Sequence, residues 1–463
     1  MRERWVVVTT LALLQAVTIA TGIYAMTDGD FSLAAMTRQT PRPTEPVKPP
    51  PAPIVTAGPV LAAGGNGPLP TKGTLAQQLT DALGDQALGD RVGAVVIDAA
   101  TGQQIFASNG DTGITPASTT KLVTSAAALA SLGPDTRLTT RVVQGRTPNA
   151  IVLVGGGDPT LAGPYAKAGA YPKQASLATL AARTADALHA QGVTKVTLSY
   201  DDTLYTGSPL APGWKPSYVP DGNVTPVHAL MIDEGRADPT RSQPRVSDPP
   251  QYAAAAFARL LAKYGVTASK TIKPAQAGQG AAKLAEVSSA PVYALVERTL
   301  TLSDNDLAEA LGRHVAIKEG QPASFQGVRA AVLKVLKRIG AAKGVSVYDG
   351  SGLSPLNKIS ADGLARLVSL AASSGNFDLR PILSGMPIAG FSGTLGHRFK
   401  RADAKGEVGI VRAKTGTLNN VNTLAGYATT HDGRLVTFAF MADKVPLAAE
   451  TVLDRLAAIV ARS

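Results

Sequence analysis

The end of the chain carries the pattern that most restricts its fold. Three apolar runs, at residues 408–418, 422–430 and 434–442, follow one another with only short connections. The last two are joined across the turn-forming letters HDG, as in a hairpin. Runs joined this closely pair as antiparallel strands, because parallel pairing needs a crossover of roughly a dozen residues. The sequence therefore predicts consecutive antiparallel strands here, followed by a closing helix over residues 448–463.

The first part of the globular region complements these strands. Residues 74–83 have the pattern of a helix, and residues 91–110 that of a hairpin around a Thr-Gly turn. Between about 140 and 285 the chain changes to short strands, two helices and long Gly/Pro loops, and strong helical periodicity returns over residues 291–374. This order predicts an α+β domain, an antiparallel sheet flanked by helices, that is split by an inserted mixed α/β domain.

The N-terminus indicates export. Arg2 and Arg4 precede an uncharged run from Trp5 to Met26, which is long enough to span a bilayer. The positive-inside rule places the start in the cytoplasm and the rest outside it. An uncleaved anchor is favoured over a cleaved signal peptide, whose apolar region is normally only about 7 to 15 residues long. We therefore expect an extracytoplasmic protein of the cell envelope that is held to the membrane through residues 5–26.

A proline-rich run at residues 41–59 cannot form a packed core and predicts an extended spacer. Together these patterns divide the chain into a membrane anchor or signal segment, a linker, the first part of the α+β domain, an insertion and the second part of that domain. The corresponding residues are 1–26, 27–72, 73–140, 141–285 and 286–463.

Composition excludes several kinds of chemistry. The chain has no cysteine, which excludes disulfides, thiolate metal sites and cysteine nucleophiles. Its five histidines do not have the spacing of a zinc motif, and there is neither a G-x-S-x-G elbow nor a Walker A loop. The net charge of +11 favours an anionic partner, but the basic residues are scattered and aromatic residues make up only 5%, which disfavours nucleic acid. We expect no cofactor, no metal and no nucleic-acid partner.

A serine and a lysine lie one turn apart at the start of a predicted helix. In the segment PASTTKLVTSAAALASLG, residues 116–133, Lys121 follows Ser118 by three positions, so both project from one face. A serine hydroxyl needs a base within reach to act as a nucleophile. Burial of this face would lower the pKa of Lys121 and let its neutral amine accept the serine proton. Alone the pair is weak support, because a serine at a helix start is more often a cap.

Two further motifs follow in order. The letters LSDNDLAEAL place Ser303 and Asn305 at the junction of two predicted helices. The letters VRAKTGTLNN place four polar or small residues on a predicted strand: Lys414, Thr415, Gly416 and Thr417. Taken alone, Ser303 could be a helix cap and Lys414 could be an exposed cation on a strand. Together, in this order and in these settings, the three motifs are typical of penicillin-interacting serine enzymes.

The chain resembles the penicillin-binding proteins, more closely the D-alanyl-D-alanine carboxypeptidases and endopeptidases of low-molecular-mass class C (peptidase S13-like). The resemblance covers roughly residues 75–460 and rests on ASTTK, SDN and KTGT. It extends to GGGDPTL, DDTLYTGSPLAPGW and YDGSGLSPLNKIS. The resemblance implies the penicillin-binding-protein/β-lactamase-like transpeptidase fold with one inserted domain. It also implies peptidoglycan stem peptides ending in D-Ala-D-Ala as substrates and β-lactams as acylating inhibitors.

The resemblance implies a catalytic role for five motif residues. Ser118 would attack the carbonyl of the terminal D-Ala-D-Ala amide and become acylated, with Lys121 as its general base. Ser303 would relay the proton to the leaving amine. Asn305 would contact Lys121 and the substrate amide. Lys414 would set the electrostatic field around Ser303.

The rest of the strand motif is implied to bind substrate. Thr415 and Thr417, with Lys414, would hold the substrate carboxylate, and the backbone N–H groups of Ser118 and Thr417 would form the oxyanion hole. A glycine at position 416, Gly416, makes physical sense because a side chain there would obstruct a substrate that binds along the strand edge.

Other residues and activities stay open. Asp349, Ser351 and Ser354 in YDGSGLS are further candidates near the site, the alternative being a turn stabilised by Asp and Gly. The chain could also be a non-hydrolytic penicillin-sensing or wall-binding protein. A class A-like β-lactamase would need a glutamate between the second and third motifs that is followed four residues later by Asn. None of the three glutamates in this interval is followed by Asn at that distance: Glu309, Glu319 and Glu407. We predict carboxypeptidase activity as dominant, accompanied by D,D-endopeptidase activity.

Overall fold

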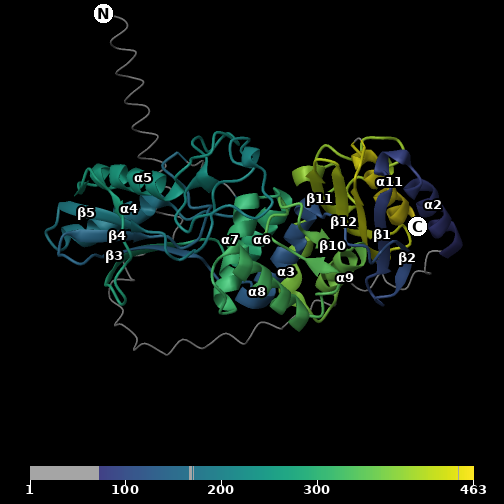
Figure 1. Cartoon of the computed structure of the whole chain (residues 1–463), viewed down its shortest axis with the longest axis horizontal. Helices are drawn as coiled ribbons and strands as arrows, with labels where there is room; N and C mark the ends of the chain where they lie inside the picture. Colours follow the sequence, from purple (N-terminus) through teal and green to yellow (C-terminus); the bar gives the residue numbers. More distant parts are fainter. Residues whose placement is uncertain (1–71, 166–168, 170, 447) are drawn as a thin grey trace, which may run out of the picture. The chain divides into compact units, whose positions relative to one another are not determined.

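The computed structural model describes residues 72–463, apart from residues 166–168, 170 and 447 (Figure 1). The membrane segment predicted at residues 5–26 and nearly all of the predicted linker lie outside these residues. Within the described part of the chain, no helix combines the length and the apolar character needed to cross a membrane.

A five-stranded antiparallel sheet forms the centre of the α+β domain, in the order β11-β12-β13-β1-β2. Its strands are β1 (Arg91–Asp98), β2 (Gln104–Ser108), β11 (Arg412–Leu418), β12 (Val421–Thr429) and β13 (Leu435–Asp443). The predicted run of three C-terminal antiparallel strands is confirmed. The predicted hairpin is also confirmed, and it joins the sheet by pairing β1 with β13.

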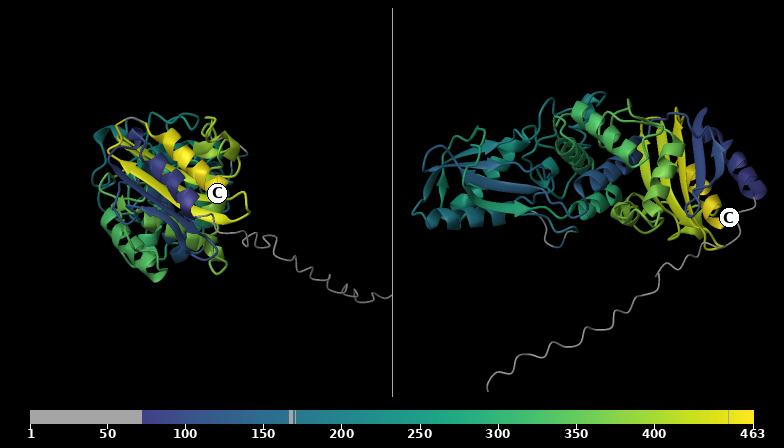
Figure 2. Two further views of the ribbon diagram at one scale, coloured as in Figure 1. Left: turned by 90° about the vertical axis from the view of Figure 1, so that its right-hand side faces the viewer. Right: turned by 90° about the horizontal axis from the view of Figure 1, so that it is seen from below.

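Alternate residues of β13 point into two different cores, so both faces of the sheet are covered. Ala439 and Met441 pack into a core made mainly by helices that precede the strands in sequence. Phe438 and Phe440 stack on the other face, in a second core that they share with helices from the two ends of the described chain, α2 (Lys72–Leu83) and α11 (Glu450–Arg462). The left view of Figure 2 shows α2 and α11, in purple and yellow, in front of the sheet.

Helix α3 (Thr120–Leu132) lies at the centre of the other helical layer. It packs against α6 (Val292–Thr301), α7 (Asn305–Lys318), α8 (Phe325–Arg338) and α9 (Ala361–Ala372). Its first ten residues are buried, and most are alanine, serine or threonine, so the neighbouring helices can approach closely. Because α3 is buried and closely packed, it holds the site at its N-terminal end in place.

The segment before α3 differs from the prediction in one detail. Ser118 lies in a short 3-10 helix, Ala117–Thr119, and not in the α-helix itself. The backbone of Ala117 has φ 48° and is packed closely between two glycines. A Cβ at Gly352 would lie 1.9 Å from the Ala117 oxygen, and one at Gly416 would lie 3.2 Å from the Ala117 Cβ. This packing holds the chain in the tighter turn.

Residues between Thr139 and Ser288 form a second, mixed sheet, in agreement with the predicted insertion of an α/β domain. The order is β6-β5-β4-β3-β8, with β7 pairing to β5, and the β4–β5 pair is parallel whereas β3 is antiparallel to both neighbours. Helices α4 (Leu177–His189) and α5 (Pro249–Lys263) share one core with this sheet. The strands are β3 (Thr139–Gln144), β4 (Ala150–Val154), β5 (Lys195–Asp201), β6 (Thr267–Ala268), β7 (Lys273–Pro274) and β8 (Lys283–Ser288).

The remaining short elements frame loops of the α+β domain. Strands β9 (Val345–Ser346) and β10 (Lys358–Ile359) pair with each other and bracket the loop that contains the letters YDGSGLS. Helix α10 (Pro381–Ser384) precedes the long connection to β11.

Candidate active site

The structure brings the three sequence motifs together around the start of α3. Lys121 Nζ lies 3.0 Å from Ser118 Oγ. Lys121 is completely buried, and this burial lowers the pKa of its ammonium from 10.5 to about 8, although nearby carboxylates, chiefly Asp349, act in the opposite direction. The amine of Lys121 is therefore much easier to deprotonate than that of an exposed lysine.

Two other contacts orient the Lys121 amine. Its Nζ lies 2.6 Å from Asn305 Oδ1 and 2.7 Å from the carbonyl oxygen of Ser351. Both partners are pure acceptors, so a neutral amine donates its two N–H groups to them. Its lone pair is then left for the third partner, the hydroxyl of Ser118. This geometry suits a lysine that takes a proton from the serine.

The Asn305 amide is fixed in the orientation that this contact needs. Its Nδ2 donates to the backbone carbonyl of Asn223, at 2.7 Å. Because a carbonyl can only accept, the Nδ2 atom must face Asn223 and the Oδ1 atom must face Lys121.

Ser303 and Lys414 form a second pair in the same site. Ser303 lies between α6 and α7 with φ 58°, and Lys414 Nζ lies 2.9 Å from its hydroxyl. Lys414 is completely buried and also donates to the carbonyl of Thr415, at 2.9 Å. Its burial, with a smaller effect from the charge of Lys121, lowers its pKa well below the ordinary value. The alternative of an exposed strand cation is wrong.

Strand β11 presents its free edge beside this pair. Ala413 donates its N–H away from β12, to the carbonyl of Pro387. Since N–H directions alternate along a strand, the N–H groups of Thr415 and Thr417 point to the same outer edge. The Thr415 hydroxyl lies 2.7 Å from that of Thr394, and the exposed Thr417 hydroxyl lies 3.2 Å from Glu450 Oε1.

The reason for a glycine at position 416 differs from the prediction. A Cβ at Gly416 would lie 2.2 Å from Thr423 Oγ1 and 2.6 Å from the carbonyl oxygen of Pro116. It would thus meet the turn that carries Ser118, whereas we expected it to meet a substrate at the strand edge. Gly416 lets β11 pack directly against the Ser118 turn.

This constellation coincides with matches to known proteins. The D-Ala-D-Ala carboxypeptidase 3 (S13) family matches residues 75–245 and 236–463. Carboxypeptidase DacB of Mycolicibacterium smegmatis is 36% identical over 458 residues, which cover 98% of this chain and 95% of that protein. The chain belongs to the D-Ala-D-Ala carboxypeptidase 3 (S13) family.

Further comparisons agree with membership of the S13 family. A carboxypeptidase of Mycobacterium tuberculosis is 37% identical over 422 residues, covering 89% of this chain and 88% of that protein. The crystal structure of penicillin-binding protein 4 of Haemophilus influenzae superimposes with a TM-score of 0.70 at 23% identity, covering 82% of this chain and 98% of that one. The predicted penicillin-binding-protein fold is confirmed, and the chain is a serine-type D-Ala-D-Ala carboxypeptidase.

In this member of the S13 family, the YDGSGLS loop helps to position Lys121. Glu309 accepts the N–H groups of Gly350 and Ser351, at 2.9 and 2.8 Å, which presents the Ser351 carbonyl to Lys121. Burial raises the pKa of Glu309 to about 7. Because both Glu309 oxygens are engaged by the loop, the glutamate is a scaffold, which agrees with its lack of the β-lactamase spacing.

The three candidates in this loop differ in what they contribute. Asp349 accepts from the backbone of Gly352 and Ser354, and also from Trp214 Nε1 at 2.8 Å. Ser351 contributes its carbonyl to Lys121, and Ser354 donates its hydroxyl to the carbonyl of Pro212. Asp349 and Ser354 thus shape the loop. The sequence gives no signal for the supporting roles of Glu309 and Trp214, because these partners are distant along the chain.

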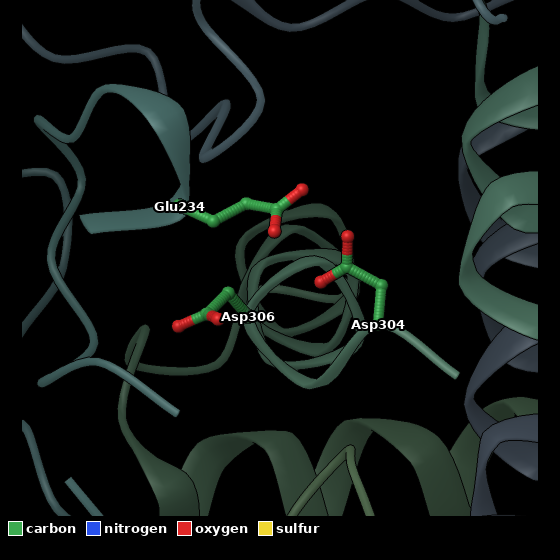
Figure 3. Close-up of side chains that lie close together, drawn as sticks. All are labelled: Glu234, Asp304 and Asp306. Atoms are coloured by element: carbon green, nitrogen blue, oxygen red, sulfur yellow. The ribbon is translucent and has the colours of Figure 1, made fainter. Parts of the chain in front are cut away.

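A buried acidic cluster near the site is compact enough to hold a metal ion, but arginines already compensate its negative charge. Ligand atoms of Glu234, Asp304 and Asp306 lie within 4.8 Å of one another (Figure 3). Three arginines contact these carboxylates: Arg236 and Arg298 at Glu234, Arg298 at Asp304, and Arg245 at Asp306. These guanidinium groups already supply the compensating positive charge, so the residues form an ion-pair network.

Proposed function

We propose that this carboxypeptidase removes the terminal D-Ala from peptidoglycan stem peptides through an acyl-enzyme on Ser118. The observation that carries the proposal is the set of three contacts at Lys121 Nζ. Asn305 Oδ1 and the Ser351 carbonyl take its two N–H groups, which leaves its lone pair for the Ser118 hydroxyl. A nucleophile with an adjacent, oriented base is what covalent catalysis requires.

In the acylation step, Ser118 Oγ attacks the carbonyl carbon of the penultimate D-Ala while its proton passes to Lys121. The C–N bond then breaks, and the proton held by Lys121 passes through Ser303, whose hydroxyl contacts Lys414 at 2.9 Å, to the leaving amine of the terminal D-Ala. In deacylation, water attacks the ester and gives one proton to Lys121, which passes it to Ser118 Oγ as the ester C–O bond breaks. Water thus replaces the proton that Ser118 lost to D-Ala, and the full cycle returns the enzyme to its starting protonation state.

Strand β11 is the proposed binding edge. An extended substrate would pair with the outward N–H groups of Thr415 and Thr417, as in strand addition. The N–H groups of Ser118 and Thr417 would bind the developing oxyanion, and the substrate carboxylate would lie near Lys414, Thr415 and Thr417. Loss of one oxyanion donor typically costs about 3 to 4 kcal/mol of transition-state stabilisation. The close packing of Gly416 on the Ser118 turn supports this arrangement, because it fixes the two donors relative to each other.

The same acyl-enzyme also supports D,D-endopeptidase activity, since a peptide cross-link is another D-Ala-linked amide. β-Lactams would acylate Ser118, and the related Haemophilus influenzae protein has been solved in complex with a β-lactam. Its substrate places the protein in the cell envelope. We further propose anchoring through residues 5–26 and an insertion bounded at about residues 141 and 285.

Release of D-Ala from a synthetic stem pentapeptide tests the proposal. We expect release by the unaltered chain and none above background by Ser118→Ala. Ser125→Ala is a matched control, because Ser125 lies on α3, which directly follows the turn that carries Ser118, and its buried hydroxyl has no hydrogen-bond partner among the described residues. Stoichiometric penicillin labelling without D-Ala release would instead support a penicillin-sensing protein.

A further inference from the structure

A segment of the insertion, residues 222–245, contacts the turn that carries Ser303 and Asn305. The carbonyl of Asn223 accepts from Asn305 Nδ2, at 2.7 Å. The N–H of Thr225 donates to Asp306 Oδ1 at 2.8 Å, and Arg245 Nη1 lies 3.0 Å from Asp306 Oδ2. The second catalytic motif is therefore held partly by residues that lie outside the α+β domain in sequence.

The buried ion-pair network adds a second connection between the same parts. Glu234, from a short 3-10 helix in the insertion, contacts Arg298 of α6. Arg298 Nε in turn lies 3.2 Å from Asp304 Oδ2, while Asp304 Oδ1 caps α7 by accepting from the N–H of Leu307, at 3.0 Å. Arg298 thus bridges Glu234 to the residue between Ser303 and Asn305. In Figure 3 the carboxylates of Glu234 and Asp304 point toward one another at the start of α7.

The backbone explains why this turn needs to be held. Ser303 has φ 58°, a left-handed conformation that is unfavourable for a serine, and Asp233 and Glu234 have φ 50° and 55°. Such conformations persist only where the surrounding structure imposes them. Both sides of the contact are therefore strained turns, and the ion pairs join one to the other.

We infer that Glu234 is a positioning residue for the active site. By holding Arg298 against Asp304, it keeps Ser303 in its left-handed turn beside Lys414 and Asn305 beside Lys121. The insertion thereby completes the active site, in addition to any role in binding the cell wall. The catalytic consequence of this inference rests on the proposed function.

Two substitutions remove the bridge in different ways. Glu234→Gln keeps the shape of the side chain but replaces one of its two carboxyl oxygens, which contact Arg236 and Arg298, with an NH2 group that cannot accept from a guanidinium. Arg298→Lys keeps the positive charge, but a single ammonium group cannot reproduce the fork that contacts both carboxylates. Asp98→Asn is the matched control, because Asp98 is also completely buried and paired with an arginine, Arg434, at the far end of β1.

The experiment measures acylation by a fluorescent penicillin over a range of concentrations, together with hydrogen exchange of the peptides that cover residues 303–309 and 222–226. We expect both bridge variants to lower the maximal acylation rate about tenfold to hundredfold, because small misplacements of catalytic groups have effects of this size. We expect the apparent dissociation constant of the non-covalent complex to change little. Exchange in both peptides rises, whereas Asp98→Asn changes neither acylation nor this exchange.

The outcomes separate the inference from the proposed function. Unchanged exchange in folded Glu234→Gln and Arg298→Lys contradicts the inference whatever the activity. Faster exchange with acylation at the rate of the unaltered chain shows that the bridge is structural only, and also contradicts it. Failure of the unaltered chain to react with penicillin contradicts the proposed function, while the exchange result still decides whether Glu234 holds the turn.

Discussion

Lys121 and Lys414 are both completely buried in one site, but only Lys121 has carboxylates that oppose the effect of its burial on the pKa. Lys121 is surrounded at longer range by acidic side chains that include Asp349 and Glu309, which raise its pKa. Lys414 instead feels the charge of Lys121, which adds to burial in lowering its pKa. The first proton taken up by this pair therefore goes to Lys121.

The rate of Ser118 acylation should rise with pH through about 8. Burial lowers the pKa of Lys121 to about 8, so below this pH the amine is increasingly protonated and cannot accept the serine proton. This rise can be tested by stopped-flow measurement of acylation by a fluorescent penicillin between pH 6 and 9.5. This range extends about a unit and a half or more on each side of the pKa. A rate that is constant over this range would exclude Lys121 as the base.

Binding of a ligand with a carboxylate should be accompanied by uptake of a proton. The pKa of Lys414 lies well below its ordinary value, and a carboxylate placed beside it favours the charged ammonium. Titration calorimetry of a D-Ala-terminated peptide with Ser118→Ala, in buffers of different ionisation enthalpy, measures the protons exchanged. We expect net uptake that disappears in Ser118→Ala/Lys414→Met, and the absence of uptake would show that Lys414 is already charged in the free enzyme.

Gly416→Ala should reduce both stability and acylation. The added Cβ would lie 2.2 Å from Thr423 Oγ1 and 2.6 Å from the carbonyl of Pro116, so β11 and the Ser118 turn must separate. Overpacking of this kind typically costs about 1 to 3 kcal/mol in the free energy of unfolding. Denaturant unfolding and penicillin acylation measure the two effects.

The control for this substitution is Gly406→Ala, which has no atom within 4 Å of the added Cβ and should change neither quantity. If Gly416→Ala unfolds and acylates like the unaltered chain, the close contact between β11 and the Ser118 turn does not constrain the site.

Local patterns were sufficient to predict most of the fold. The strand periodicity of residues 408–442 and the hairpin at 91–110 predicted all five strands of the central sheet, because each pattern depends on neighbours in sequence. The pairing of β1 with β13 could not be predicted from such patterns, since its partners are more than 300 residues apart. The pairing of β3 with β8 could likewise not be predicted, because it joins the two ends of the insertion.

The motif residues lie together as predicted, but their supports were not visible in the sequence. Ser118 contacts Lys121 and Ser303 contacts Lys414, in agreement with the three motifs. The roles of the Asn223 carbonyl and of Glu234 depend on how the insertion packs against α6 and α7, which no spacing reveals. The close packing of Gly416 on the Ser118 turn was not predicted for the same reason, because this turn is far away in sequence.

Mapping of the penicillin adduct tests the central claim most directly. The chain is incubated with a fluorescent penicillin, digested and analysed by mass spectrometry, in parallel with Ser118→Ala and Lys121→Met. We predict a single adduct on Ser118 that is absent from Ser118→Ala and forms about a hundredfold or more slowly in Lys121→Met, as expected for loss of a general base. An adduct on another residue, or label that survives Ser118→Ala, would contradict the assignment of Ser118 as the nucleophile.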